Sequence, residues 1–262
     1  MISSLPSLLA VAGSFAVALF GRSVAQRTFF AVVLAAVAFD FGIFAAASFA
    51  GRPELGGWLQ AIFAWSLVAV LSGWGAADRR RWRAAAENAL VLAPPFPGRW
   101  RVAAGGPWAR ENHHLAASDQ RYAYDFVRLD ASSFGSPILA PADGDVAAAR
   151  DGMEDHPPSR RVRAEGRRPC GNYVAIETGR AFVLLCHLQR GSVRVTTGDR
   201  VRAGDEIARC GNSGNTSVPH LHLHAQDRAA EAPFVAQGVP VAFRDGGRVR
   251  VLGARDRFPE HG

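Results

Sequence analysis

Three histidines in the C-terminal part of the sequence alternate with leucines in a pattern that could hold a metal ion. His220, His222 and His224 are separated by Leu221 and Leu223, in the segment PHLHLH. This period of two is that of a β-strand, so the imidazoles share one face and the leucines face a core. Neutral imidazole is a good zinc ligand, and a strand fixes the direction of its nitrogens. The segment predicts a metal site; the alternative is a solvated histidine-rich strand.

A hydrolytic zinc site needs three protein ligands and an open position for water. His222 can supply one ligand. Asp125 is the best candidate for the second, because it interrupts an apolar and aromatic strand, where a carboxylate is costly unless it is paired or bound to metal. A charge partner such as Arg121 is the alternative explanation. The third ligand is expected from His113 or His114, upstream of that strand.

Two further histidines are candidates for proton transfer. His187, in VLLCHL, has Val183 and Leu185 on its own strand face, where a histidine packed in the core is the ordinary expectation. If it faced the metal, it could hydrogen-bond the attacking water or the oxyanion formed on the scissile carbonyl. His220 could act in the same way from the other side.

The chain from Trp100 onward predicts an all-β domain, because short β-type runs are separated by Gly, Pro, Asp and Asn. The segment 150–168 is polar, rich in arginine and interrupted by proline, which predicts a loop over one edge of the sheet. The predicted strand regions are 121–130, 136–150, 171–179, 181–188, 191–214 and the histidine segment.

The N-terminal part predicts three transmembrane helices. Residues 4–21, 28–50 and 57–77 are apolar and long enough to cross a bilayer. The first could instead be a signal peptide, although its start lacks the usual positive charge. Asp40, in the second span, is expected to face another helix, because facing lipid would cost about 2.5–3.5 kcal/mol.

These patterns divide the chain into four parts. Residues 1–83 form a membrane region, 84–98 a proline-containing linker, 99–245 the β domain and 246–262 a tail. The basic segment at 78–83 follows the third span, and by the positive-inside rule it predicts a cytoplasmic β domain.

Charge and cysteine content exclude several classes of function. The net charge of +7 over 262 residues comes from arginine alone, since the chain has no lysine. No arginine cluster is interleaved with aromatic residues as in a nucleic-acid-binding module, so no nucleic-acid partner is expected. Three cysteines are too few for a disulfide framework.

The ordered series QRYAYDF, ILAPADGDV, GNYVAIE, CHL, GDRVRAGDEIARCGNSGNT and PHLHLH resembles the lysostaphin and LytM family of zinc metallopeptidases, which cut peptides of bacterial peptidoglycan. The resemblance implies a β-rich barrel or sandwich of the duplicated hybrid motif type. It also implies a zinc ion bound by a His, an Asp and the second His of HxH. By position, Asp125 and His222 match ligands, while His187 and His220 match the two catalytic histidines.

One departure from the family pattern affects the first ligand. The compact H-x-x-x-D motif would place a histidine at position 121, where this chain has Arg121. The sequence resembles instead a divergent branch in which N-x-H precedes Q-R-Y-A-x-D. That match favours His114 over His113 as the ligand. If neither reached the metal, the domain would be a binding module.

The predicted function is a membrane-anchored zinc metalloendopeptidase acting on peptidoglycan stem peptides or cross-bridges. One alternative is a catalytically inactive domain of the same fold that binds peptidoglycan or regulates a hydrolase. A second is a carrier or phosphotransfer domain, but a carrier would need a lysine for attachment of its group. Cleavage of peptidoglycan requires the domain to lie outside the cytoplasmic membrane, which conflicts with the charge rule.

Overall fold

The chain divides into two compact units, Met1–Arg80 and Arg81–Gly262. The computed structural model describes residues 42, 45–46, 48–52, 82, 84, 87–106, 112–158, 168–229 and 235–259. The three predicted spans lie outside these residues, apart from a few positions of the second, and so does Asp40. Within the described ranges, no helix is long and apolar enough to cross a membrane.

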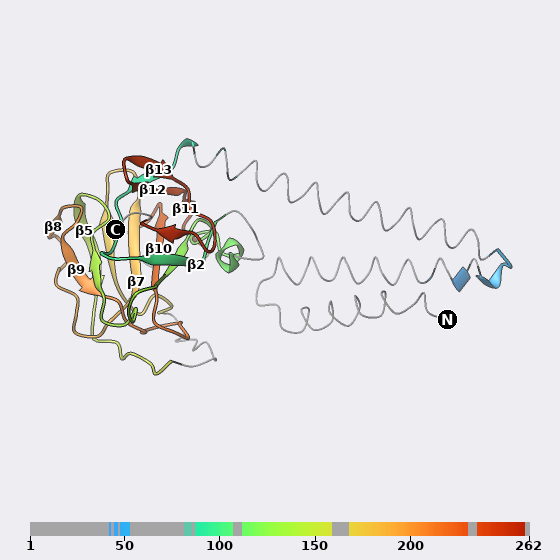
Figure 1. Ribbon diagram of the computed structural model, residues 1–262, viewed down its shortest axis with the longest axis horizontal. Coiled ribbons are helices and arrows are strands. Elements are labelled where there is room, and N and C mark those ends of the chain that lie inside the picture. Colours follow the sequence, from blue (N-terminus) through green and yellow to red (C-terminus); the bar gives the residue numbers. More distant parts are fainter. Residues whose placement is uncertain are drawn as a thin grey trace. The chain divides into compact units, whose positions relative to one another are not determined.

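The second unit is built from β-strands, which confirms the all-β prediction for this part of the chain (Figure 1). The strands fall in the regions where short apolar runs alternate with turn residues. In chain order the elements are β1 (Leu90–Leu92), β2 (Trp100–Ala104), the 3-10 helix η1 (His113–Ala116), β3 (Tyr124–Arg128), β4 (Pro137–Leu139), β5 (Gly144–Arg150), β6 (Asn172–Glu177), β7 (Phe182–Leu188), β8 (Arg200–Val201), β9 (Glu206–Arg209), β10 (Leu221–Gln226), β11 (Gly238–Val239), β12 (Val241–Asp245), β13 (Arg248–Arg250) and β14 (Arg257–Phe258).

One large sheet carries most of these strands. Its order is β14-β2-β3-β10-β7-β6-β5-β8, and β11 pairs with β10. Two smaller sheets, β1-β12-β13 and β4-β9, accompany it. The histidine strand β10 lies between β3 and β7, so its neighbours are the strands that carry Asp125 and His187.

The two faces of β10 have different surroundings. Leu221 and Leu223 belong to the main apolar cluster, together with Phe126 of β3 and Phe243 of β12. The cluster thus includes side chains from both the large sheet and a small one. Because side chains alternate along a strand, the histidines lie on the opposite face of the sheet. The core face fixes the register of β10 and so places its imidazoles.

The predicted linker and tail contribute strands to the domain. β1 lies in the segment 84–98 and pairs in parallel with β12, from Leu90↔Val241 to Leu92↔Phe243. The tail, 246–262, contains β13 and β14, and β14 pairs with β2. A three-residue strand is too short to show a recognisable alternation of apolar and polar residues, and the partner of β1 lies far away in the sequence.

A fragment that begins at residue 96 is expected to be less stable than one that begins at residue 81. Leu90 and Leu92 are 7% and 0% exposed, and the shorter fragment loses both. Burial of each leucine contributes about 1.5–3 kcal/mol, so the loss should be roughly 3 kcal/mol or more. Urea unfolding of the two fragments measures it. A third fragment from residue 88 keeps β1 and serves as control; equal midpoints for all three would contradict the expectation.

Candidate metal and catalytic site

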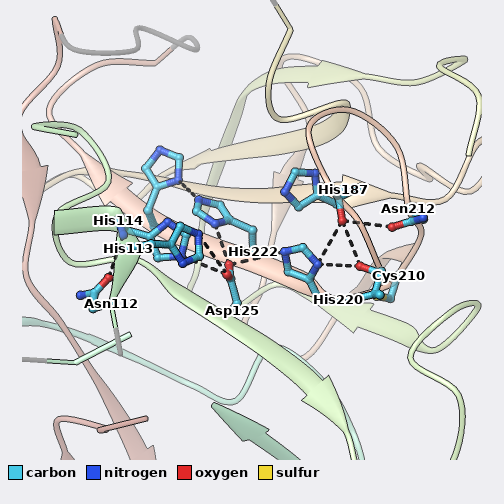
Figure 2. Close-up of polar contacts among 12 residues, drawn as sticks. Asn112, His113, His114, Asp125, His187, Cys210, Asn212, His220 and His222 are labelled. Carbon is cyan, nitrogen blue, oxygen red and sulfur yellow. Dashed lines mark hydrogen bonds and ion pairs between the residues drawn. The ribbon is translucent and has the colours of Figure 1, made fainter. Parts of the chain in front are cut away.

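Asp125 lies at the centre of the candidate site. β3 and β10 are antiparallel with His222 directly opposite Asp125, so both side chains project from one face. The Asp125 Oδ1 and His222 Nδ1 atoms are 2.9 Å apart, and both residues are buried. Figure 2 shows Asp125 between His113 and His114 on one side and His220 on the other.

The segment before β3 brings His114 to the same carboxylate. Asn112 caps η1: its Oδ1 accepts a hydrogen bond from the His114 N–H at 3.1 Å, and its Nδ2 donates to the Gly106 carbonyl at 2.8 Å. His114 Nε2 then lies 3.1 Å from Asp125 Oδ2, with its side chain 6% exposed. The His113 ring is 68% exposed and its Nε2 is 3.8 Å from the same oxygen. The geometry therefore favours His114 over His113.

The donor set at this point suits a metal ion. His114 Nε2 is buried, and within the described part of the chain it has no hydrogen-bond partner, although a carboxylate oxygen is close. Such an atom is costly to bury unless a ligand satisfies it. His113, His114 and Asp125 each offer a ligand atom within 4.8 Å of the others. Imidazole and carboxylate donors are those that zinc binds in hydrolases.

His220 presents one ring nitrogen to the site. Its Nδ1 is 2.8 Å from the Val218 carbonyl, so Nδ1–H donates to that oxygen. The Nε2 atom therefore carries the lone pair in the neutral ring. It lies 3.5 Å from Asp125 Oδ1. This is the orientation a general base requires.

A β-bulge turns His187 away from its expected position. Strict alternation would place it with Val183 and Leu185 in the core. Instead, Asn172 pairs with Leu188 and Tyr173 with Cys186, so His187 is the extra residue, with φ of 62°. Bulges commonly re-aim side chains beside functional sites.

The bulge brings the His187 ring to within 4.8 Å of the His220 ring, between centroids. His187 Nδ1 lies 2.8 Å from the Ser213 carbonyl and donates to it, which leaves Nε2 as the acceptor. The structure therefore places His187 and His220 side by side, each held through Nδ1 by a backbone carbonyl.

Burial and mutual charge set the protonation of the cluster. Burial alone would raise the pKa of Asp125, but the neighbouring imidazoles of His114 and His220 outweigh it and hold that pKa well below its usual value. Burial lowers the pKa of His187 well below its usual value, and also lowers the pKa of His222. For His220, the charge of Asp125 outweighs burial and raises the pKa. At neutral pH the carboxylate is thus ionised, while His187 and His222 are neutral.

The face of β10 continues beyond the predicted ligand. His222 Nε2 lies 3.0 Å from His224 Nδ1, and His224 Nε2 lies 3.2 Å from Gln226 Oε1. The sequence pattern placed His224 on this face but indicated no role for it or for Gln226. Cys186, opposite His222 on β7, offers its sulfur within 4.8 Å of donor atoms of His222 and His224.

Gly171→Ala is expected to disturb the support of His187. Gly171 has φ of +64°, and an added Cβ would lie 2.4 Å from the carbonyl carbon of Ser213, whose oxygen holds His187. Gly152→Ala is the matched control, because φ is +91° there and no atom lies within 4 Å of the new Cβ. Both changes carry backbone strain, so overpacking should make Gly171→Ala more destabilising by about 1–3 kcal/mol. Urea unfolding of the two variants measures the difference; equal losses would contradict it.

Arg121 does not take part in the cluster through its side chain. It is exposed, and its backbone carbonyl accepts a hydrogen bond of 3.4 Å from Asn112 Nδ2. Arg121 is therefore not the charge partner of Asp125. The position that carries histidine in the compact motif instead supports the loop that carries His114.

Comparison with known proteins identifies the domain. Residues 125–233 match the sequence profile of peptidase family M23. Over these residues, the β domain is similar to peptidase family M23. This confirms the predicted resemblance to lysostaphin and LytM-type proteins, and the match begins at Asp125.

Relatives of the M23 domain include proteins named as peptidases. An uncharacterised metalloprotease of Haemophilus influenzae is 32% identical over 127 residues, which cover 45% of this chain and 23% of that protein. The peptidoglycan DD-endopeptidase ShyA of Vibrio cholerae is 25% identical over 148 residues, covering 56% of this chain and 30% of ShyA. The chain thus spans less than a third of the length of these two relatives.

The similar solved structures include lysostaphin from Staphylococcus simulans, at 23% identity over 45% of this chain and 41% of that one, with a TM-score of 0.32. A zinc-containing peptidase from Vibrio cholerae is 21% identical over 57% of this chain and 38% of that one, also with a TM-score of 0.32.

Proposed function

We propose that this protein is a membrane-anchored zinc metalloendopeptidase that hydrolyses peptide bonds of peptidoglycan. Its metal ligands in this proposal are His114, Asp125 and His222, and its catalytic histidines are His187 and His220. The M23 profile and the metalloprotease relatives support the reaction class.

The convergence of three donors on one point carries the proposal. His114 Nε2 and His222 Nδ1 approach opposite oxygens of the Asp125 carboxylate, at 3.1 Å and 2.9 Å. The three residues come from η1, β3 and β10, so the fold and not the local sequence holds them together. Two imidazoles and one carboxylate form a common ligand set of hydrolytic zinc sites, in which a fourth position stays open for water.

The remaining histidines fit the proton transfers of peptide hydrolysis. When bound by the three ligands, zinc would polarise a water molecule and the scissile carbonyl. One of His187 and His220 accepts the proton of the attacking water at Nε2, and the other, when its Nε2 is protonated, donates a hydrogen bond to the oxygen of the scissile carbonyl as that oxygen gains charge. Both rings are oriented by the carbonyls of Ser213 and Val218, so neither must rotate to act.

A peptidoglycan substrate is supported by ShyA and by the similar ShyC of Vibrio cholerae, both named peptidoglycan DD-endopeptidases. Such a substrate places the M23 domain outside the cytoplasmic membrane. This location requires one of two topologies. Either the N-terminus is cytoplasmic and the chain has three membrane spans, or the first segment is cleaved and two spans remain. Protease treatment of spheroplasts tests it: digestion of the domain without lysis supports the proposal, and protection until lysis contradicts it.

Digestion of purified peptidoglycan tests the activity. The full-length protein in detergent micelles is incubated with sacculi, and the soluble products are analysed by mass spectrometry. We expect new free amino groups on muropeptides, loss of activity with a chelator, and its recovery with zinc. Bound zinc with no cleavage of sacculi would favour the alternative, an inactive peptidoglycan-binding or hydrolase-regulating domain.

A further inference from the structure

His222, His224 and Gln226 form a buried polar row on β10. They are 4%, 1% and 0% exposed, and they share the face opposite Leu221 and Leu223 because the side chains of the strand alternate. Polar groups buried this deeply require hydrogen-bond partners. Within the row, each side chain is the hydrogen-bond partner of the next one.

The direction of each hydrogen bond follows from the far end of the row. The Arg228 carbonyl can only accept, so the atom of Gln226 that lies 2.8 Å from it is the amide Nε2, which donates. Gln226 Oε1 therefore faces His224 Nε2, at 3.2 Å, and accepts its proton. The neutral His224 ring then has its lone pair on Nδ1.

The same reasoning extends to the proposed ligand. Because His224 Nδ1 is an acceptor, the contact of 3.0 Å with His222 requires the proton to be on His222 Nε2. The lone pair of the neutral His222 ring is therefore on Nδ1, 2.9 Å from Asp125 Oδ1. Two acceptors at this distance repel unless a cation lies by them, and zinc bound by both would be that cation.

We propose that His224 and Gln226 are positioning residues, which hold the proton of His222 on Nε2 and so direct its Nδ1 lone pair to the metal. The inference rests on the proposed zinc site. Ligand histidines in metal sites commonly donate their second ring N–H to a carboxylate, carbonyl or water. Here the neutral imidazole of His224 accepts the second N–H of His222. The amide of Gln226 accepts the N–H of His224, and the row ends on a backbone carbonyl.

A competing use of the same atoms is a second metal site. The sulfur of Cys186 and the facing nitrogens of His222 and His224 are close enough to bind an ion. An ion there would displace the proton from His222 Nε2 and occupy the lone pair of His224 Nδ1, the two atoms that the row joins by a hydrogen bond. The two uses therefore exclude each other and predict different spectra.

Zinc affinity of full-length variants tests the proposal. His224→Phe keeps a ring but removes the acceptor, and we expect a zinc Kd about 10–100-fold higher, measured by competition with a chromophoric chelator. His224→Gln restores an acceptor and should recover most of the affinity. Gln226→Leu interrupts the row at its far end and should weaken zinc in the same direction. If all three variants were folded and bound zinc with the Kd of the wild type, the proposal would be overturned.

Two spectroscopic readouts complete the test. In histidine-labelled wild-type protein, ¹⁵N shifts should show His224 protonated at Nε2 and not at Nδ1, with or without zinc; the reverse tautomer would overturn the proposal. In cobalt-substituted protein, a thiolate charge-transfer band that Cys186→Ser removes would overturn it in favour of the second metal site. If the wild type bound no zinc, the proposed function would fail, whereas the His224 tautomer would still be decided separately.

Discussion

Asp125→Ala is expected to reduce the zinc content of the full-length protein from one ion per chain to none, and to abolish peptide hydrolysis. The Asp125 carboxylate lies close to both other proposed ligands, with Oδ2 toward His114 and Oδ1 toward His222. Substitution of residues that merely orient ligands costs 10–100-fold in metal affinity, so loss of this ligand should cost more than about 100-fold. Metal analysis of the wild type and the variant, after a mild chelator wash and re-addition of zinc, measures the loss of bound zinc.

Thermal unfolding provides a second readout of the same variant. A ligand that binds only the folded state stabilises it by about 4 kcal/mol at a concentration 1,000 times Kd. Zinc should therefore raise the Tm of the wild type and leave that of Asp125→Ala unchanged.

His113→Ala is the matched control for His114→Ala, because the two residues are adjacent in η1 but only the His114 ring is buried. We expect His113→Ala to retain zinc and His114→Ala to lose it. Zinc retained by folded Asp125→Ala would contradict the proposed site. Loss from His113→Ala, with retention in His114→Ala, would exchange the assigned ligand.

His187→Ala and His220→Ala are expected to lower kcat strongly while zinc stays bound. Neither residue is a proposed ligand, and each directs Nε2 away from a backbone carbonyl. Loss of a general base costs about 10²–10⁴-fold, and loss of an oxyanion donor about 10²–10³-fold. Cleavage of a peptidoglycan peptide at saturating substrate measures both.

The pH profile separates the two roles. A general base must be unprotonated, so the wild-type rate falls as pH drops through its pKa, and removal of that residue should abolish this acidic limb. Removal of the oxyanion donor should lower the rate wherever that imidazole is protonated and leave the acidic limb in place. Wild-type kcat in either variant, or loss of zinc from both, would contradict the assignment.

Much of the β domain could be predicted from local sequence. The strands β3, β6 and β7 lie within their predicted regions, and β10 begins in the histidine segment and extends two residues beyond it. Two-residue alternation and flanking turn residues are local signals, which is why these regions could be predicted. The choice of Asp125 as a candidate ligand beside His222 followed from one anomaly, its carboxylate in an apolar strand, and the pairing of β3 with β10 places these two residues opposite each other.

Other features depended on partners far away in the chain. β1 and β14 fell in the predicted linker and tail, because each has only two or three residues and pairs with a distant strand. His187 reached the site through a bulge that breaks strand alternation, whereas regular alternation by itself indicated a core position. The role inferred for His224 and Gln226 depends on hydrogen bonds between their side chains and that of His222, which only the folded structure shows.

The sequence by itself determined the β class of the domain and the set of donors, because alternation and residue chemistry are properties of short segments. Tertiary structure decided which donors meet. It separated the buried ring of His114 from the exposed ring of His113, turned His187 toward His220, and set the proton order along β10. The physical reason is that burial, bulges and hydrogen-bond direction depend on what packs against a residue, and those neighbours come from elsewhere in the chain.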